Sequence, residues 1–334
     1  MRLCTGCVLP ESFPGIRFDA AGMCNYCREF AARPSAESLK ARYRTKFDGI
    51  VNQVRGTSEY DCVLAYSGGK DSTYTLWLLR ERYRLNVLAV TFDNGFVSPD
   101  AFTNIRRSVE TLNVDHILVK PRFDLLRKIF AEVSESGLFP AKALERASSI
   151  CTACISLVKN ATLRIAIEKH APILAWGFSS GQADMRASIL KMNALMLRAM
   201  HDSRSLPLLK IAGDAVRSHL LNESHFAEDV EFPYNVNFLG FHDCSEEDEL
   251  VRIRELGWQE PRDTDGNSSN CLLNAYANRQ HIQKFGFHPY AFEVAGLVRA
   301  GALSREEGLA KLENLGNEST CRAIAMRLGV REEF

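Results

Sequence analysis

The chain has 334 residues, 46% of them hydrophobic and 25% charged, and its 41 Lys and Arg residues balance 41 Asp and Glu residues. This composition is that of a soluble globular protein and excludes an intrinsically disordered one. The zero net charge argues against a large basic surface for nucleic acid. We expect a cytoplasmic protein, because no apolar run approaches the ~18 residues of a membrane span and the N-terminus lacks an apolar export signal.

Two pairs of cysteines with the same spacing open the chain. Cys4 and Cys7 form the first Cys-x-x-Cys pair, and Cys24 and Cys27 form the second, with sixteen residues between the pairs. A two-residue gap lets both thiolates of a pair reach one cation, and four sulfurs complete a closed tetrahedron around zinc. Cysteines in a reducing compartment are metal ligands more often than disulfides. Residues 1–30 are therefore predicted to form a structural zinc ribbon.

A glycine-containing loop follows the first predicted elements. The charged, Ala-rich stretch over residues 31–58 predicts a helix that links the ribbon to the rest of the chain. An apolar run at 61–66 predicts a buried strand, and the amphipathic pattern after residue 72 predicts a helix. Between them stands Ser67-Gly68-Gly69-Lys70-Asp71-Ser72. At a strand–loop–helix junction of this kind, free backbone N–H groups and the helix N-terminus can bind an anion.

The side chains of this loop are those of a phosphate site. Ser67 and Ser72 can donate hydroxyl hydrogen bonds to phosphate oxygens, and Lys70 adds a positive charge. Asp71 repels a phosphate unless a cation lies between them, which predicts Mg²⁺. The loop departs from the Walker pattern, which needs four residues between its glycines. It resembles the SGGxDS loop of the PP-loop ATP pyrophosphatases, in the adenine-nucleotide alpha-hydrolase-like (HUP) superfamily.

The resemblance implies an activity and an ATP site. Members of the superfamily cleave ATP between the α- and β-phosphates and place AMP on an oxygen of the substrate. They hold the adenosine at the end of the second strand, which corresponds to a predicted strand at 87–92 in this chain. The residues implied for nucleotide binding are Tyr66, Ser67, Gly68, Gly69, Lys70, Asp71, Ser72, Phe92, Asp93 and Gly177.

Predicted strands and helices alternate along the middle of the chain. After the strand at 87–92 they are a helix at 101–112, a strand at 116–119, a helix at 123–135, a helix at 155–170 and a strand at 173–176. This alternation predicts an α/β fold with a doubly wound parallel sheet. Ligands bind such sheets beyond the carboxyl ends of the strands, where the loop, Asp93 and residues 177–182 meet.

The predicted domain organisation has four parts. They are a zinc ribbon at 1–30, a linker helix at 31–58, a PP-loop ATP pyrophosphatase domain at 59–182 and a mainly helical substrate region at 183–334.

Three further cysteines form a second group. Cys151 and Cys154 stand at the start of the helix before the strand at 173–176, where the helix dipole favours a thiolate of low pKa. Cys271, in a polar loop-like stretch, is the candidate third partner. Three thiolates can hold an iron–sulfur cluster with one iron left open, form a redox pair beside a bystander, or bind a second zinc.

The remaining features carry weaker predictions. The Met-rich run at 185–200 is interpreted as an adaptable helix in the core, with a mobile cover over the site or a homodimer face as alternatives. His281 and His288 are interpreted as structural or substrate contacts, because neither has the spacing of a metal ligand. Cys62 is predicted to be a buried small hydrophobe. Two cysteines have no predicted function, namely Cys244 and Cys321.

The ribbon and the loop together resemble two groups of enzymes. Cys4-Thr-Gly-Cys7-Val-Leu-Pro, Pro14-Gly-Ile-Arg-Phe-Asp19 and Cys24-Asn-Tyr-Cys27 resemble the N-terminus of N-acetyl sugar amidotransferases. The loop resembles that of these enzymes and equally that of ATP-dependent thiolation enzymes. The cluster-dependent thiolation enzymes hold a [4Fe–4S] cluster with a Cys-x-x-Cys and a distant third cysteine, a layout that Cys151, Cys154 and Cys271 match.

The resemblance implies ATP, Mg²⁺ and adenylation of a carbonyl oxygen, with Lys70, Asp71 and the three cysteines outside the ribbon as catalytic residues. Adenylation makes AMP the leaving group, and a nucleophile then attacks the carbon. Because the three cysteines match the cluster layout, we expect sulfur as that nucleophile, from the cysteine site or a sulfur donor. The alternatives are ammonia from a partner glutaminase, delivered to a sugar or similar metabolite, and a non-catalytic nucleotide-binding protein. The neutral charge favours a small-molecule substrate over tRNA.

Overall fold

A six-stranded sheet forms the centre of the computed structural model, which describes residues 2–32, 36–178, 185–242, 245–265 and 267–330. The strand order is β3-β2-β1-β4-β6-β5, and every neighbouring pair is parallel except β5 with β6. The strands are β1 (Cys62–Ala65), β2 (Val87–Phe92), β3 (Asp115–Val119), β4 (Ile173–Trp176), β5 (Ile189–Lys191) and β6 (Tyr234–Asn237).

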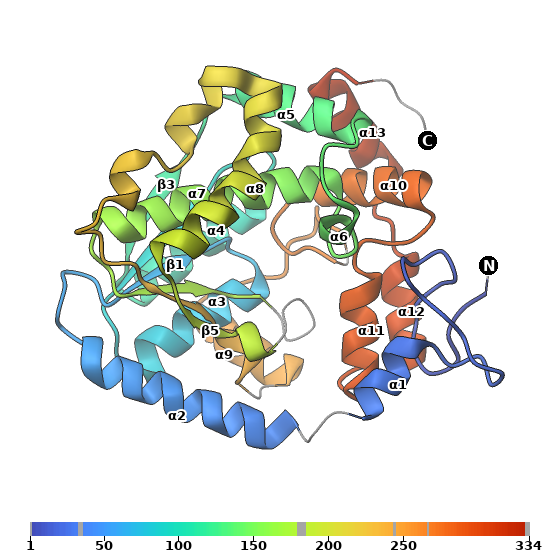
Figure 1. The fold of residues 1–334 in the computed structure, drawn as a ribbon, viewed down its shortest axis with the longest axis horizontal. Coiled ribbons are helices and arrows are strands. Elements are labelled where there is room, and N and C mark those ends of the chain that lie inside the picture. Colours follow the sequence, from blue (N-terminus) through green and yellow to red (C-terminus); the bar gives the residue numbers. More distant parts are fainter. Residues whose placement is uncertain (1, 33–35, 179–184, 243–244, 266, 331–334) are drawn as a thin grey trace.

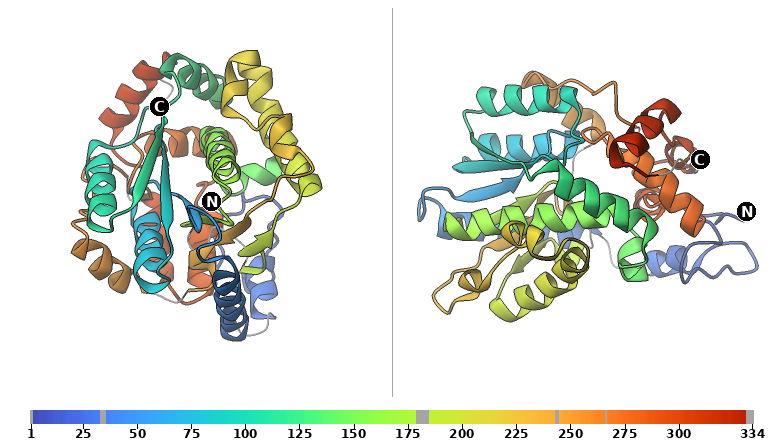
Figure 2. Two further views of the ribbon diagram at one scale, coloured as in Figure 1. Left: turned by 90° about the vertical axis from the view of Figure 1, so that its left-hand side faces the viewer. Right: turned by 90° about the horizontal axis from the view of Figure 1, so that it is seen from above.

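Helices cover both faces of the sheet and gather again beside the ribbon (Figures 1 and 2). The α-helices are α1 (Asn25–Ala31), α2 (Ala36–Val54), α3 (Lys70–Trp77), α4 (Pro99–Thr111), α5 (Phe123–Glu135), α6 (Ala141–Leu144), α7 (Ser149–Glu168), α8 (Ala194–Ala212), α9 (Glu246–Glu255), α10 (Leu273–Phe285), α11 (Ala291–Arg299), α12 (Arg305–Glu313) and α13 (Glu318–Leu328). The chain also has a π-helix, η1 (Leu78–Arg82). Its 3-10 helices are η2 (Met185–Ala187), η3 (Gly213–His219), η4 (Glu223–Phe226) and η5 (Phe238–Gly240).

The two faces of the sheet are buried against different helices. Leu64 of β1 packs on the side of α2 and α4, in one cluster with Phe47 and Ile105. Its neighbour Val63 packs on the opposite side, in one cluster with Leu163 of α7. Strands buried on both faces are typical of parallel sheets, which explains the uninterrupted apolar runs of β2 and β4. The predicted doubly wound α/β fold is confirmed.

Several predicted elements coincide with the observed ones, and one is wrong. β2, α5 and β4 have the predicted bounds. The predicted helix at 185–200 is wrong over its first half, where residues 189–191 form the edge strand β5. The helix α8 begins only at Ala194, because the Asn193 side chain accepts a hydrogen bond from the Met196 N–H at 2.9 Å and caps the helix there. The sheet therefore takes its last two strands, β5 and β6, from beyond residue 182.

Helix α7 is the most apolar long helix among the described residues. It is the one helix in these ranges that is long and apolar enough to cross a membrane, and 56% of that window is buried inside the protein. Its apolar side chains pack against β1, β2 and β4. The position of α7 is thus that of a core helix.

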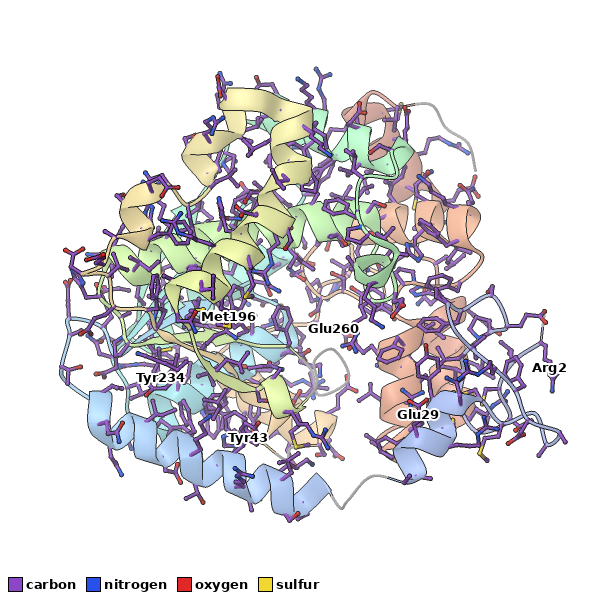
Figure 3. All side chains as sticks on the ribbon, in the orientation of Figure 1. Arg2, Glu29, Tyr43, Met196, Tyr234 and Glu260 are labelled. Atoms are coloured by element: carbon purple, nitrogen blue, oxygen red, sulfur yellow. The ribbon has the colours of Figure 1, made fainter. Side chains whose placement is uncertain are left out.

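The ribbon packs against the C-terminal helices, far from it in the sequence. Figure 3 labels Arg2 and Glu29 at this end of the molecule, beside α11 and α12. The ring of Phe13 lies 5.2 Å from that of Phe287. The guanidinium of Arg305, in the first turn of α12, donates to the backbone carbonyl oxygens of two ribbon cysteines at 3.1–3.3 Å. The ribbon and α12 therefore form one packed unit.

We predict that Leu64→Ala lowers the free energy of unfolding by about 2–5 kcal/mol, because it removes buried methyl groups from the central strand and leaves a cavity. Leu195→Ala, at a site that is 82% exposed, is the control and should change this free energy by less than about 0.5 kcal/mol. Urea denaturation measures both. Equal effects of the two substitutions would contradict the position of β1 in the core.

Candidate functional site

The glycine loop connects β1 to α3 at the carboxyl edge of the sheet. The hydroxyl oxygens of Ser67 and Ser72 lie 3.0 Å apart, so the loop curls back on itself. The Gly69 N–H donates to Ser67 Oγ at 3.3 Å, and Trp258 Nε1 donates to the carbonyl of Gly68 at 3.0 Å. Lys70 is the first residue of α3. The predicted strand–loop–helix junction is thus present, with the helix N-terminus at the loop.

Two glycines at this edge of the sheet, Gly68 in the loop and Gly177 after β4, have no room for a side chain. Gly68 has φ +75°, and a Cβ there would stand 2.6 Å from Ile105 Cγ1. Gly177, directly after β4, approaches α3 so closely that a Cβ would stand 2.7 Å from the Cα of Ser72. Both glycines are therefore required by close backbone approach, which holds the loop against its neighbours.

Lys70 is held by three carboxylates. Its Nζ lies 2.9 Å from Asp71 Oδ1, 2.9 Å from Glu249 Oε2 and 3.6 Å from Glu246 Oε1. Burial disfavours the charge on Lys70, but Asp71 and Glu249 outweigh it and raise its pKa. Lys311 Nζ also lies 4.0 Å from Glu246 Oε2, so three carboxyl groups and two ammonium groups meet at this corner.

Glu249 is a site residue that the sequence analysis missed. It is 8% exposed, and burial raises its pKa to about 7, although Lys70 opposes the shift. In the sequence it is one of several acids in the first turn of a helix, a position usually explained by the helix dipole. Packing of α9 against α3 brings it to the loop.

A cavity of about 320 Å³ opens beside the loop. Tyr66, the loop residues 67 and 69–72, Phe92 and Gly177 line one part of it. Two residues implied for nucleotide binding, Gly68 and Asp93, do not line it. The Asp93 carboxylate instead accepts the Gly95 N–H at 2.8 Å and pairs with Lys120 at 2.9 Å. Residues 179–182, also predicted at this edge, lie outside the described residues.

The three cysteines outside the ribbon line the other part of the same cavity. Cys151 and Cys154 stand in the first two turns of α7, where Ser148 Oγ accepts the Cys151 N–H at 3.1 Å. Cys271 reaches them through a bridge between its backbone and that of Val97, after β2. The cysteines and the phosphate loop, although distant in sequence, therefore face one space.

Asn94 joins two of these cysteines and was not predicted as a site residue. Its Nδ2 lies 3.4 Å from Cys154 Sγ and 3.4 Å from Cys271 Sγ, and donates to both. Its Oδ1 accepts the Phe96 N–H at 2.8 Å, which fixes the orientation of the amide. An amide donor to two sulfurs favours their thiolate or metal-bound forms.

A buried hydrogen-bond chain supports Cys151. Asn274 Nδ2 donates to both carboxylate oxygens of Asp265, at 3.1 and 2.9 Å. Asn274 Oδ1 then accepts from the Tyr290 hydroxyl at 3.1 Å and lies 3.8 Å from Cys151 Sγ. The amide is thereby held with its oxygen toward the cysteine.

The pKa values of the pocket cysteines differ from the sequence prediction. Burial raises the pKa of Cys151 to about 12 and also raises those of Cys154 and Cys271. The expectation of low-pKa thiols at the start of this helix is wrong, because loss of hydration outweighs the helix dipole. These groups become thiolates only beside a compensating positive charge, such as that of a metal.

Lys159 is a further unpredicted group at this end of the cavity. Its ammonium lies 5.9 Å from the ring centre of Trp176 and 5.5 Å from that of Phe178, and both rings line the cavity. Burial lowers its pKa to about 7. A lysine of this kind can accept a proton near neutral pH.

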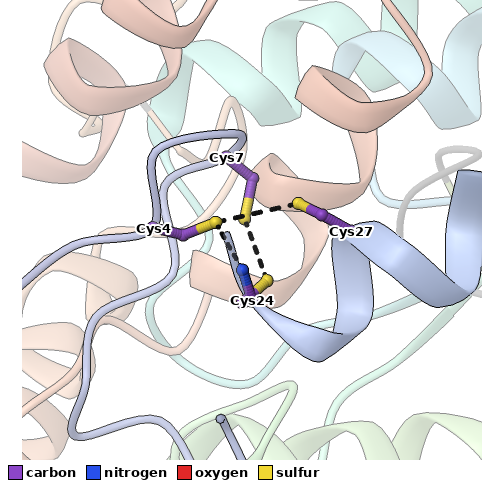
Figure 4. A group of neighbouring side chains, drawn as sticks. All are labelled: Cys4, Cys7, Cys24 and Cys27. Atoms are coloured by element: carbon purple, nitrogen blue, oxygen red, sulfur yellow. Dashed lines mark hydrogen bonds between the residues drawn. The ribbon is translucent and has the colours of Figure 1, made fainter. Parts of the chain in front are cut away.

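The ribbon cysteines form a metal site (Figure 4). The sulfur atoms of Cys4 and Cys27 lie 3.8 Å apart, as do those of Cys7 and Cys24, and the four thiols are unbridged and buried. A tetrahedron with metal–sulfur bonds of ~2.3 Å has edges of about 3.8 Å. The chain is therefore folded to the dimensions of a tetrahedral four-sulfur site.

The pocket cysteines have a different spacing. Among the described residues, the ribbon cysteines are the only group of three or more His, Cys, Asp or Glu side chains whose ligand atoms all lie within 4.8 Å of one another. At least one pair of sulfur atoms among Cys151, Cys154 and Cys271 therefore lies more than 4.8 Å apart. Of the unassigned cysteines, Cys62 is fully buried in β1, as predicted. Cys321 is buried, and Cys244 lies outside the described residues.

Comparisons with known proteins identify distant relatives. No protein-family model matches the chain. The uncharacterized protein MJ1599 of Methanocaldococcus jannaschii is 25% identical over 280 residues, which cover 84% of this chain and 81% of that protein.

Solved structures with a similar fold are still more distant in sequence. The U34-tRNA thiolase NcsA from Methanococcus maripaludis, with its [4Fe-4S] cluster, is 17% identical and covers 100% of this chain and 99% of its own, at a TM-score of 0.37. The NH3-dependent NAD synthetase from Campylobacter jejuni is 13% identical and covers 90% and 99%, at 0.36. The NMN synthetase from Francisella tularensis is 11% identical with the same coverage, at 0.34.

At TM-scores below 0.5 these three structures assign neither a substrate nor a residue of this chain.

We predict that Glu249 makes stability depend on pH. Its pKa rises from 4.5 to about 7 on folding, so its stabilising effect is complete below about pH 4.5 and is lost as the pH rises through about 7. Between about pH 4 and pH 8, wild type should lose up to ~3 kcal/mol of unfolding free energy relative to Glu249→Gln, since glutamine does not titrate. Urea denaturation at several pH values measures this difference, and a constant difference would contradict the prediction.

Proposed function

We propose that the protein is an ATP-dependent transferase that adenylates a carbonyl oxygen of a small molecule and replaces that oxygen with sulfur. The observation that supports this most directly is the shared cavity. The phosphate loop lines one part of it, and three cysteines line another part. The Asn94 amide donates hydrogen bonds to two of these cysteines. A substrate carbonyl group bound between the loop and the cysteines can meet the α-phosphate of ATP on one side and a sulfur nucleophile on the other.

The loop corner fits a nucleotide with a divalent cation. Phosphates bind to the backbone N–H groups and hydroxyls of the loop, and Lys70 supplies positive charge on the pyrophosphate side. Asp71 and Glu249 provide the carboxylate oxygens that Mg²⁺ prefers. Mg²⁺ bound there supplies charge neutralisation for the departing pyrophosphate.

The pocket cysteines are a candidate ligand set for an iron–sulfur cluster. Their thiolates would hold the cluster, which would supply a site for sulfide. Cys151, Cys154 and Cys271 are the three ligands in this proposal. Asn94 donates to two of them and orients them.

The reaction has two steps. The carbonyl oxygen attacks the α-phosphorus of ATP and pyrophosphate leaves, which joins AMP to the substrate. Sulfide then attacks the carbon, a C–S bond forms, the C–O bond breaks, and AMP leaves with the electron pair. Lys159, beside the rings of Trp176 and Phe178, can accept the proton that sulfide loses.

The ribbon has a structural role in this proposal, with zinc as its metal. Four sulfur ligands leave no open position for chemistry. The Arg305 contacts attach the ribbon to α12, and Phe13 attaches it beside the end of α10. The helix that carries Asn274 is thereby supported from outside the cavity.

The second candidate is an amidotransferase that uses ammonia from a partner glutaminase. The ribbon sequence resembles that of the N-acetyl sugar amidotransferases. Burial keeps the pocket cysteines protonated, which suits thiols that hold no metal. In this case the adenylation step is the same and ammonia replaces sulfide.

We predict that Gly177→Ala weakens ATP binding about tenfold or more, because the added methyl group displaces the backbone of Ser72 in a close-packed loop. Isothermal titration with MgATP measures the affinity. Gly137→Ala, at a site with open space around its Cα, is the control and should bind ATP like wild type. Unchanged binding by Gly177→Ala would contradict the placement of ATP at this loop.

Metal analysis of anaerobically purified protein tests the choice between sulfur and nitrogen. We predict about four irons and four sulfides per chain, lost in Cys151→Ala and Cys271→Ala, together with one zinc that both variants keep. Cys62→Ala is the control and should keep both metals. Zinc alone, unaffected by these substitutions, would contradict sulfur transfer and support the amidotransferase.

A further inference from the structure

Buried polar atoms without hydrogen bonds concentrate behind the cavity. Among the described residues, eleven buried side-chain nitrogen and oxygen atoms have no partner, and five of them belong to Asn278, His281 and His288. These side chains are 1%, 2% and 6% exposed. Buried polar groups in native proteins nearly always have a partner, and a bound small molecule is the usual one where no protein group serves.

Two of these residues share a helix face with a residue of the cavity wall. Asn274, Asn278 and His281 follow one another on α10 at positions i, i+4 and i+7, which places them on one face of the helix. Asn274 itself lines the cavity. At 1.5 Å per residue, the face runs about 10 Å from Asn274 to His281. A polar stripe thus leads inward from the cysteine site.

His288 lies opposite this stripe and closes it back to the cavity. Its Nδ1 accepts the Tyr290 N–H at 3.1 Å, so its proton is on Nε2, which has no partner. Tyr290 in turn lines the cavity and donates to Asn274. Burial lowers the pKa values of His281 and His288 to about 4, so both rings are uncharged at neutral pH. The two sides of the stripe offer hydrogen bonds without charge.

We propose that Asn278, His281 and His288 form a binding track for small uncharged hydrogen-bonding molecules, filled with water at rest, that leads to the cysteine end of the cavity. Such a track admits an uncharged hydride of sulfur or nitrogen while ATP occupies the loop end. This last role rests on the proposed function, whereas the track itself does not.

The inner end of the track lies one aromatic ring from solvent. The Phe285 ring centre is 4.6 Å from that of His281. Phe285 is half-buried, and its neighbours Lys284 and Gly286 are exposed. Movement of this ring opens the track without disturbing the loop.

A crystal structure of the full chain at a resolution that shows ordered water is the first test. We expect water molecules within hydrogen-bond distance of Asn278, His281 and His288. Dry packing around all three side chains would overturn the proposal, whatever reaction the enzyme performs.

Access to the pocket thiols is the second test, on reduced, cluster-free protein with a zinc-loaded ribbon. With a non-hydrolysable ATP analogue bound, hydrogen peroxide is the small uncharged probe, and mass spectrometry follows the oxidation of Cys271. Oxidation needs the thiolate as well as access to it, so all variants are compared at one pH, where Asn278→Leu and His281→Phe should slow it about fivefold or more and Phe285→Ala should accelerate it. Asn237→Leu, which replaces a buried unpartnered asparagine outside the track, should leave the rate unchanged.

Retained zinc and an unchanged unfolding temperature establish that each variant is folded. Equal rates in the folded track variants and wild type would overturn the track. Absence of iron from the purified protein would exclude only sulfide as the molecule that the track carries. If the track holds, repeating the experiment with ammonium chloride as a competitor of peroxide, at a pH where part of it is ammonia, shows whether the track admits the nitrogen hydride.

Discussion

The close approach of β4 to the start of α3 is the constraint on which the site depends. β1 and β4 are neighbours, but the chain leaves β1 toward α3 on one face and reaches β4 from α7 on the other. The strands therefore diverge beyond their carboxyl ends, and a ligand can enter between the two connections. Gly177 lets the backbones meet at this point. The loop lies on one side of the space between the two connections, and the cysteines of α7 lie on the other side.

The sequence predicts the elements whose information is local. The strands β2 and β4 are continuous apolar runs, and the ribbon is given by two Cys-x-x-Cys pairs, so both could be read from the residues alone. β5 and β6 could not, because three or four residues at a sheet edge have no distinctive pattern. The loop was predicted because its phosphate-binding groups are consecutive.

Glu249 and Asn94 show what sequence reasoning cannot reach. Glu249 stands 179 positions from Lys70, and Asn94 stands 177 from Cys271. Each looks ordinary in its own segment, one as an acid in a helical first turn and the other as a turn residue. Only tertiary packing gives them their partners. The same packing reversed the expected acidity of Cys151, because burial is a property of the fold and the helix dipole is a property of the segment.

The attachment of the ribbon has a consequence for the whole molecule. Arg305 donates hydrogen bonds to the backbone carbonyl oxygens of Cys4 and Cys7, so the position of α12 depends on the conformation of these two cysteines. Metal binding and folding are thermodynamically linked. In the proposed function, metal in the first thirty residues contributes to the rigidity of a cavity wall built from the last seventy. A chain whose ribbon lacked metal would then keep the loop after β1 but have a less rigid cavity wall.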